Sequence, residues 1–199
     1  MHGVAVVLAG GASRRMGASK ARLEWHGQPL LVHVVERLQS HFGRVVVVGG
    51  DVQSLCPPGV LWLEDEQPGA GVAASICGAL RRLQQPCFVC GCDMPFVHAG
   101  LGRWLLENGG GCAAHVPHWQ GSPQPLHAAW FPETVNALQQ KLSEGERTMW
   151  RILHSMDEVG AVRWAGEAEV RQFDADGQCF VNLNTPQDWA QWSARPERR

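Results

Sequence analysis

Near its start the chain carries an apolar run, Val4 to Leu8, that breaks at once into a glycine-rich loop. A short run of aliphatic and β-branched residues bounded by glycine is typical of a buried strand. The adjacent Gly10 and Gly11 allow the backbone to approach a ligand closely and to turn its N–H groups toward an anion. The pattern therefore predicts an anion-binding loop at the end of a strand.

Cationic side chains follow these glycines. Arg14, Arg15 and Lys20 supply the donors that a polyphosphate requires. A Walker loop is excluded because Ala18 follows Gly17 where that loop has lysine, and the dinucleotide fingerprint G-x-G-x-x-G is absent. The alternative is an ordinary strand-to-helix turn with surface arginines, but such turns seldom need so many cations. We therefore predict a nucleotide phosphate loop of another type.

Composition and charge limit the classes of partner that this chain can bind. A chain of 199 residues fits one α/β domain. Its net charge of −2 provides no overall attraction to nucleic acid or to an anionic membrane, so an anion site must be local. No apolar stretch approaches the ~20 residues of a membrane span, and a first strand at Val4 leaves no room for a signal peptide. We expect a cytoplasmic protein with no nucleic-acid or membrane partner.

Seven cysteines raise the question of disulfides or a metal site. The number is odd, and several cysteines stand in apolar runs, where a reduced thiol packs as a small hydrophobe. Cys90 and Cys92 are separated by a single residue, fewer than a zinc site requires, and no Cys–His set follows. We expect reduced cysteines that fill the core and no structural metal.

The first half of the chain alternates apolar runs with helical patterns. Strands are expected at residues 45–48, 60–63 and 87–90, and helices at 30–38 and 71–83. Because the strand-like runs are apolar on both faces, they indicate a mainly parallel sheet covered by helices. The predicted fold is a single three-layer Rossmann-like α/β domain with a mainly parallel, mixed sheet and helices on both faces.

The second half is less regular. Its expected elements are strands at 112–116 and 126–130, helical segments at 132–142 and 145–154, and a strand end at 180–184 that turns into a final helix at 186–192. Residues 115–125 are rich in Pro, Gln, His and Trp, and are either a loop near a ligand or a surface hairpin.

Two carboxylates, Asp65 and Asp93, each follow an apolar run. Parallel sheets bind ligands beyond the carboxyl ends of their strands, where the glycine loop and both carboxylates are expected to meet. Mg²⁺ favours one or two carboxylates with phosphate oxygens, so Asp93 is the expected metal ligand and Asp65 is placed for the base, the ribose or a metal-bound water. The alternatives are a helix N-cap for Asp93 and a turn residue for Asp65.

Several short motifs occur in order along the chain at suitable separations. They are Leu8-Ala9-Gly10-Gly11, Arg15-Met16-Gly17 with Lys20, Glu64-Asp65, Gly91-Cys92-Asp93-Met94-Pro95, Gln124-Pro125-Leu126, Gly145-Glu146-Arg147 and Asn182-Leu183-Asn184-Thr185-Pro186. Together they resemble the molybdenum cofactor guanylyltransferase family over residues 4–192. The first loop alone is typical of a broader superfamily of nucleotidyltransferases, and the last two motifs narrow the resemblance.

The resemblance implies transfer of GMP from GTP to the terminal phosphate of Mo-molybdopterin, with release of pyrophosphate and with Mg²⁺ as cofactor. The implied nucleotide contacts are Leu8, Ala9, Gly10, Gly11, Lys20, Asp65 and Asp93. Arg15, Lys20 and Asp93 are the expected catalytic residues, and Asp93 is the expected metal ligand. Asn182 and Asn184 match positions near the pterin, where side chains can equally cap the turn into the last helix.

The implied partners are GTP and Mo-molybdopterin, with molybdoenzymes or their chaperones as further partners. We expect one nucleotidyltransferase domain over residues 1–194, with a nucleotide half at about 1–108 and an acceptor-side half at about 109–194. Residues 195–199 are expected to be a frayed tail.

Two positions depart from the family pattern, and both bear on base selection. Val48 stands where the family often has asparagine, and Ser75 ends a segment where the family has Gly-Pro-Leu-Ala-Gly; a serine there resembles the related cytidylyltransferases. The enzymatic alternatives are cytidylyl transfer to molybdopterin and NTP-dependent nucleotidyl transfer to a sugar or polyol phosphate. The non-enzymatic alternatives are a scaffold for molybdoenzyme maturation and a nucleotide-binding regulator; the presence of both Lys20 and Asp93 argues against the regulator.

Overall fold

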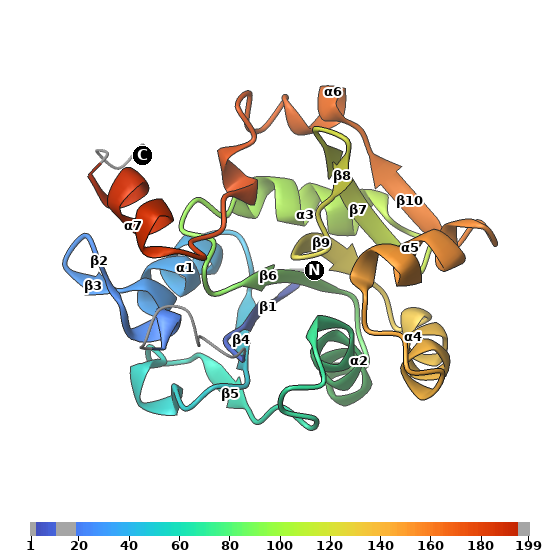
Figure 1. Cartoon of the computed structure of the whole chain (residues 1–199), viewed down its shortest axis with the longest axis horizontal. Coiled ribbons are helices and arrows are strands. Elements are labelled where there is room, and N and C mark those ends of the chain that lie inside the picture. The colour runs from blue at the N-terminus through green and yellow to red at the C-terminus, as the bar shows by residue number, and fades with distance from the viewer. Residues whose placement is uncertain (1–2, 11–18, 195–199) are drawn as a thin grey trace.

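A computed structural model describes residues 3–10 and 19–194 of the chain, and its centre is an eight-stranded sheet (Figure 1). Seven strands lie in the order β10-β7-β9-β6-β1-β4-β5, and β8 pairs with β7. The bounds of these strands are β1 Val4–Leu8, β4 Arg44–Val48, β5 Leu61–Leu63, β6 Cys87–Gly91, β7 Ala114–Trp119, β8 Ser122–Pro123, β9 His127–Trp130 and β10 Val162–Ala165. A separate short hairpin joins β2 (Glu24–Trp25) to β3 (Gln28–Pro29).

The sheet is mainly parallel. Strand β1 pairs in parallel with both β4 and β6, β5 extends this arrangement beyond β4, and β10 pairs in parallel with β7. Strand β9 is antiparallel to its neighbours β6 and β7, so β6 and β7 run in the same direction. The carboxyl ends of β1, β4, β5, β6 and β7 therefore share one edge of the sheet. The predicted mixed α/β fold is confirmed.

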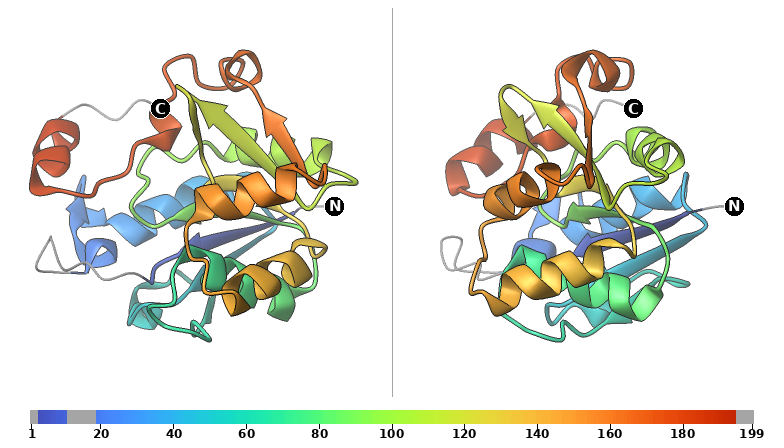
Figure 2. Two further views of the ribbon diagram at one scale, coloured as in Figure 1. Left: turned by 45° about the vertical axis from the view of Figure 1, so that its right-hand side comes forward. Right: turned by 90° about the vertical axis from the view of Figure 1, so that its right-hand side faces the viewer.

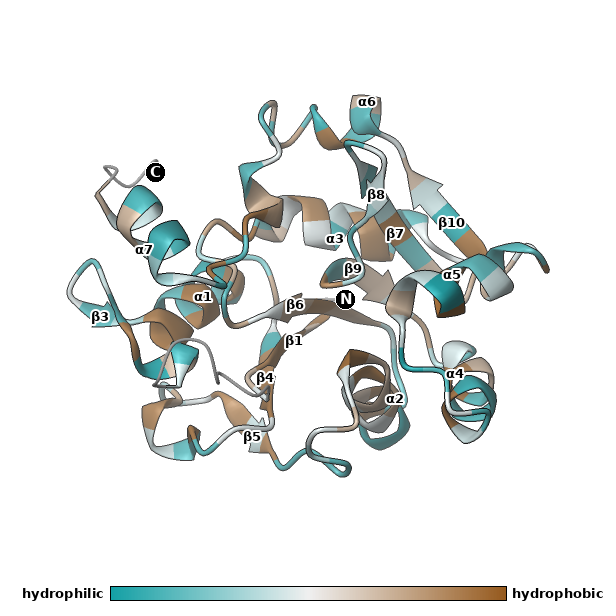
Figure 3. Ribbon diagram, in the orientation of Figure 1, coloured by the Kyte–Doolittle hydropathy of each residue, from teal (hydrophilic) through white to brown (hydrophobic). Residues whose placement is uncertain are grey.

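Burial of both faces explains the sequence of the central strands. All five residues of β1 and all five of β6 are buried, as expected for parallel strands covered on both sides. Successive side chains alternate between the faces: Ala5 and Val7 join one core cluster, and Val4 and Val6 join the other. In Figure 3 the central strands are accordingly brown, whereas the outer turns of α2 and α4 are teal.

Helices cover both faces and complete the three layers (Figure 2). One face packs against α1 (Leu30–Gln39) and α3 (Ala99–Asn108), and the other against α2 (Val72–Leu83), α4 (Thr134–Ser143) and α5 (Met149–Asp157). The remaining helices are α6 (Glu167–Val170) and α7 (Pro186–Ser193), with short 3₁₀ turns at Lys20–Arg22, Gln53–Leu55 and Gln178–Phe180. Among the described residues no helix is long and apolar enough to cross a membrane.

Two parts of the chain differ from the sequence-based expectation. Residues 180–184 form no strand, because Phe180 ends a 3₁₀ turn and Leu183 N donates to Asp93 O at 2.9 Å, which holds this segment beside the loop after β6. Residues 115–125 form the β7–β8 hairpin. This is the hairpin that the composition left as an alternative to a ligand-binding loop.

Helix α3 was not predicted, because its first half carries Gly100 and Gly102, which weaken a helical pattern. Gly102 has a packing reason: a Cβ there would lie 2.8 Å from the ring of Phe88. The seven cysteines are free thiols, and five of them are buried. Burial raises the pKa of the Cys92 thiol to about 12, so the neutral thiol acts as a packing group there.

His127 on β9 is a buried ionisable group that should make folding sensitive to acid. Its ring lies 4.9 Å from that of Phe88 and 5.3 Å from that of Phe180, centroid to centroid. Burial lowers the pKa of His127 from 6.5 to about 3. Between these two pH values the unfolded chain binds more protons than the folded one, so stability falls as the pH falls.

We predict that His127→Leu loses less stability than the wild type on acidification from about pH 7 to about pH 4.5, because the wild type loses roughly 1.4 kcal/mol per pH unit below the unfolded pKa. Urea unfolding at the two pH values measures the difference. His41→Gln is the control, since His41 is exposed and the variant should follow the wild type. An equal loss in the wild type and His127→Leu would contradict the prediction.

Candidate active site

The loop after β1 is held between the ends of two neighbouring strands. Ala9 N donates to Val48 O at 2.9 Å, and Cys92 N donates to Leu8 O at 3.0 Å. The start of the predicted phosphate loop is therefore fixed from both sides by the parallel sheet. Gly11 and Arg15, which the sequence also assigned to the site, lie outside the described residues.

Two glycines that follow β4 pack closely against this loop. Gly49 and Gly50 have φ angles of +76° and +66°, in the left-handed region that favours glycine. A Cβ on Gly49 would lie 3.2 Å from Gly10 Cα, and one on Gly50 would lie 2.8 Å from Ala9 O. The close approach of the two loops thus requires glycine at both positions. Val48, just before them, is buried in the core.

Asp65 follows β5 and faces Gly10. A Cβ built on Gly10 would lie 3.4 Å from Asp65 Oδ2, so the carboxylate is in contact range of the loop backbone. The same oxygen accepts a hydrogen bond from Ser75 Oγ at 2.7 Å, and Oδ1 accepts one from Gln67 N at 3.0 Å. Asp65 is therefore both a turn residue and an oriented carboxylate beside the phosphate loop.

Lys20 and Asp93 form an ion pair beyond the end of β6. Lys20 Nζ lies 2.8 Å from Asp93 Oδ2 and donates to Asn184 Oδ1 at 2.5 Å. The side chains of Lys20 and Asp93 are 16% and 18% exposed, so the pair is shielded but still reachable. Asp93 does not cap the next helix: His98 is the N-cap of α3 and accepts from Leu101 N at 3.0 Å.

The N-terminus of α7 sets the position of Asn184. Asp188 Oδ2 accepts from Asn184 N at 3.0 Å and from Thr185 N at 2.8 Å, while Thr185 Oγ1 accepts from Asp188 N at 3.1 Å. The hydrogen bond to Thr185 is the main cause that lowers the pKa of Asp188, with the charge of Lys20 as a smaller one. This capping box was missed in the sequence, although Thr185-x-x-Asp188 matches its Ser/Thr-x-x-Asp/Glu signature.

The two asparagines of the motif do different things. Asn184 binds Lys20, whereas Asn182 Nδ2 donates to Phe180 O at 3.0 Å and so satisfies the local backbone. Neither side-chain bond caps the turn into α7, because Thr185 and Asp188 make that cap. Two groups result at one edge of the sheet: Gly10 with Asp65 on the β4–β5 side of β1, and Lys20 with Asp93 and Asn184 on the β6 side.

Asp93 is the residue best suited to a metal at this edge. Among the described residues no group of three or more His, Cys, Asp or Glu side chains could enclose a metal ion. A lone carboxylate fits Mg²⁺, which binds one or two carboxylates and takes its other ligands from water and substrate phosphates. It does not fit zinc, which needs several nitrogen or sulfur ligands from the protein.

Comparison with known proteins agrees with this geometry. Residues 5–159 match the family model described as "MobA-like NTP transferase domain". A probable molybdenum cofactor guanylyltransferase of Methanosarcina mazei is 31% identical in an alignment that covers 92% of this chain and 87% of the relative. One from Pelotomaculum thermopropionicum is 30% identical over 192 residues, which cover 94% of this chain and 90% of the relative.

Solved structures give the same result. Molybdopterin-guanine dinucleotide biosynthesis protein A from Archaeoglobus fulgidus superposes with a TM-score of 0.81 at 29% identity, covering 94% of this chain and 95% of that one. A 2-C-methyl-D-erythritol 4-phosphate cytidylyltransferase from Thermus thermophilus, with a TM-score of 0.66 and 19% identity over 98% of both chains, shares the fold. The family resemblance found in the motifs is confirmed, and the chain belongs to the MobA-like NTP transferase family.

Proposed function

We propose that this protein transfers GMP from GTP to the terminal phosphate of Mo-molybdopterin and releases pyrophosphate. As a member of an NTP transferase family, the chain is a nucleotidyltransferase. Relatives that match more than nine-tenths of its length are named molybdenum cofactor guanylyltransferases, which supports GTP and molybdopterin as the two substrates. Molybdoenzymes or their chaperones are proposed to receive the product, and the cytoplasm is the proposed compartment.

The observation that carries the proposal is the Lys20–Asp93–Asn184 group beside the glycine loop. Nucleotidyl transfer needs little covalent help: the enzyme holds the triphosphate, neutralises the charge that develops on it, and aligns the attacking phosphate. Lys20 provides a fixed cation at the carboxyl edge of β6, held by two oxygen acceptors 2.8 Å and 2.5 Å away. The pair is already formed, so the charge needs little reorganisation when the nucleotide binds.

We assign the remaining roles by position. The backbone of Leu8, Ala9 and Gly10 lines the phosphate site, with Gly11 and Arg15 extending the loop. Asp65, oriented by Ser75, binds the ribose or the base. Asp93 would hold Mg²⁺, which when bound neutralises the charge on the α-phosphate and on the leaving pyrophosphate. Asn182 and Asn184 belong to residues 109–194, the proposed acceptor-side half of a single domain over residues 1–194, and we assign them to the acceptor side.

Base selection depends on the acceptors around the glycine turn after β4. Guanine offers N–H donors, and this site can meet them with backbone carbonyls at Gly49 and Gly50 and with the Asp65 carboxylate. Trp62 Nε1 donates to Gly49 O at 3.2 Å, which fixes the orientation of that carbonyl. Ser75 in the place of a family glycine favours a second candidate, cytidylyl transfer to the same acceptor.

We predict that Lys20→Ala lowers kcat/KM for GTP by ~10²-fold or more, because a preorganised cation on the transferring phosphates typically contributes that much. Pyrophosphate release with purified Mo-molybdopterin measures the effect. Lys141→Ala is the matched control, since Lys141 pairs with Glu144 on the outer helix α4 and should leave turnover unchanged. Wild-type kinetics in a folded Lys20→Ala variant would refute the assignment of the phosphate site.

For Asp93→Asn we expect loss of Mg²⁺-dependent turnover with the fold retained. The amide oxygen can still accept from Lys20, so the substitution removes the charge and keeps the shape. Turnover across a magnesium titration is the measurement, and Asp51→Asn, at a fully exposed carboxylate, is the control. Near-wild-type activity of Asp93→Asn over the whole titration would exclude the metal role.

We expect GTP to be preferred over CTP and ATP, because a wrong base leaves polar groups of the site without partners. Ser75→Ala removes one hydrogen bond to Asp65, so it should raise KM for GTP and change kcat little. Competition assays with each nucleotide at fixed Mg²⁺ measure both effects. A wild-type preference for CTP would overturn guanylyl transfer and leave nucleotidyl transfer in place.

A further inference from the structure

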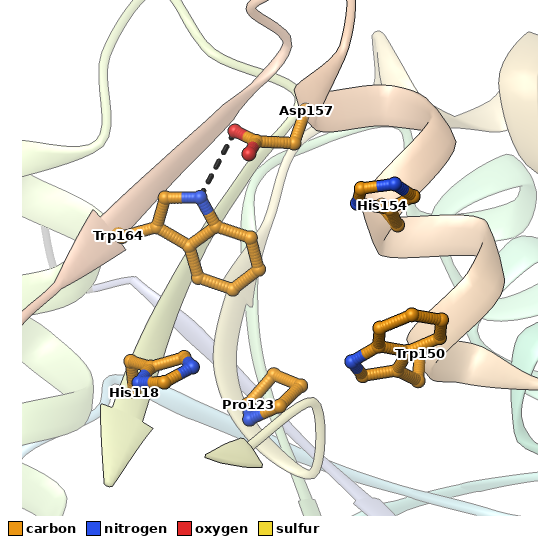
Figure 4. Close-up of a pocket in the computed structure, with 6 residues that line it drawn as sticks. All are labelled: His118, Pro123, Trp150, His154, Asp157 and Trp164. Carbon is orange, nitrogen blue, oxygen red and sulfur yellow. Dashed lines mark hydrogen bonds between the residues drawn. The ribbon is translucent and has the colours of Figure 1, made fainter. Parts of the chain in front are cut away.

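A pocket of about 400 Å³ lies on the α5 face of the sheet, apart from the residues of the nucleotide site (Figure 4). Side chains from β7, β8, α5 and β10 surround it. They are His118, Pro123, Trp150, His154, Asp157 and Trp164.

Two aromatic walls face each other across this pocket. On one side the rings of Trp150 and His154 are stacked, with centroids 5.4 Å apart and planes 9° apart. On the other side His118 meets Trp164 edge to face, with centroids 5.9 Å apart. Trp150 is 58% exposed, so part of its indole is open to a ligand. The arrangement suits a flat ring inserted between the walls.

Asp157 lies at one end of the pocket and adds a carboxylate acceptor to its aromatic lining (Figure 4). Its Oδ1 accepts a hydrogen bond from Trp164 Nε1 at 2.9 Å, which fixes the direction of the carboxylate. A fixed carboxylate beside two aromatic walls selects a flat heteroaromatic ring with adjacent N–H donors on one edge. The 2-amino-4-oxo-pyrimidine edge has this pattern, and both pterins and guanine carry it.

The order of the strands distinguishes these two sources. The glycine loop with Asp65 lies on the β4–β5 side of β1, Lys20 and Asp93 lie at the end of β6, and the pocket lies beyond them on the β7–β10 side. A guanine that binds beside Asp65 is therefore on the opposite side of the catalytic pair from this pocket. The acceptor must approach the pair from the other direction, which is the side of the pocket.

The strand register gives the separation between the ends of β7 and β6. His115 on β7 stands opposite Ala129, which stands opposite Phe88 on β6, so His115 and Phe88 are level across the sheet. His118 and Gly91, each three residues further along, are then level at the same edge. Two strand spacings separate β7 from β6, which is about 10 Å. A pterin bearing a phosphorylated side chain is long enough to cross a gap of this order.

We propose that the Trp150–Trp164 pocket binds the pterin ring of the acceptor, with Asp157 accepting from its 2-amino-4-oxo edge. This inference rests on the proposed function, because it assigns the ring whose phosphate receives GMP. It makes Trp150 and Asp157 binding residues for the acceptor, and it leaves nucleotide binding to the other side of β6.

The test is equilibrium binding of neopterin monophosphate, a phosphorylated pterin, to the full chain, with GMP as the second probe. Trp150→Ala should weaken pterin binding about tenfold, the effect of losing one stacked ring, and Asp157→Asn should weaken it at least about tenfold. GMP binding should not change in either variant. Val159→Ala, at an exposed residue next to the pocket segment, and Glu107→Gln, on α3, are the controls.

Equal pterin binding in the wild type and both variants would overturn the proposal, as would no pterin binding by the wild type. Weaker GMP binding in Trp150→Ala with pterin binding unchanged would assign the pocket to guanine and also overturn it. Because binding needs no turnover, these outcomes are independent of whether the enzyme transfers GMP. With active enzyme, Trp150→Ala should raise KM for Mo-molybdopterin and leave KM for GTP unchanged.

Discussion

The parallel pairing of β1 with both β4 and β6 is the constraint on which the site depends. It brings three loops from distant parts of the chain to one edge, where the backbone of Leu8 and Ala9 is bonded to the neighbouring strand ends. The pairing is stable because β1 is completely buried, so each apolar side chain that defines the strand also stabilises the loop that follows it.

The sheet also separates the proposed nucleotide site from the aromatic pocket. Strand β6 ends at the ion pair of Lys20 and Asp93, the nucleotide side extends toward β5, and the aromatic pocket lies toward β10. The antiparallel β9 adds a strand between β6 and β7 without changing the edge at which they end. The two proposed substrate sites therefore lie side by side along one edge, with Lys20 and Asp93 between them.

Much of this fold could be predicted from sequence, because long β-branched runs such as Val45–Val48 leave few alternatives to a buried parallel strand. Predictions failed where tertiary packing decides the local structure. Helix α3 tolerates Gly102 because Phe88 occupies the space of a side chain, and residues 180–184 are straightened by a bond to Asp93 rather than by a neighbouring strand. Neither cause lies within the local pattern.

The candidate site divides in the same way. Its strand-end residues, Asp65 and Asp93, follow from the position of the apolar runs. The different hydrogen bonds of Asn182 and Asn184 could not be predicted, because both side chains can cap a turn. Only the fold decides which one reaches Lys20. The aromatic pocket gave no signal either, since Trp150 and Trp164 are two of nine tryptophans.

The bond between Lys20 and Asn184 spans 164 residues of sequence. During synthesis the strands β1, β4 and β6 can pair long before residue 184 leaves the ribosome, so a nascent chain can hold a folded sheet without an assembled catalytic group. Helix α7 buries none of its residues fully and is held by its capping box and by edge contacts such as that of Trp189 on Trp25. Assembly of the candidate site therefore has to await residue 184, and loss of residues 184–194 would remove the Asn184 acceptor of Lys20.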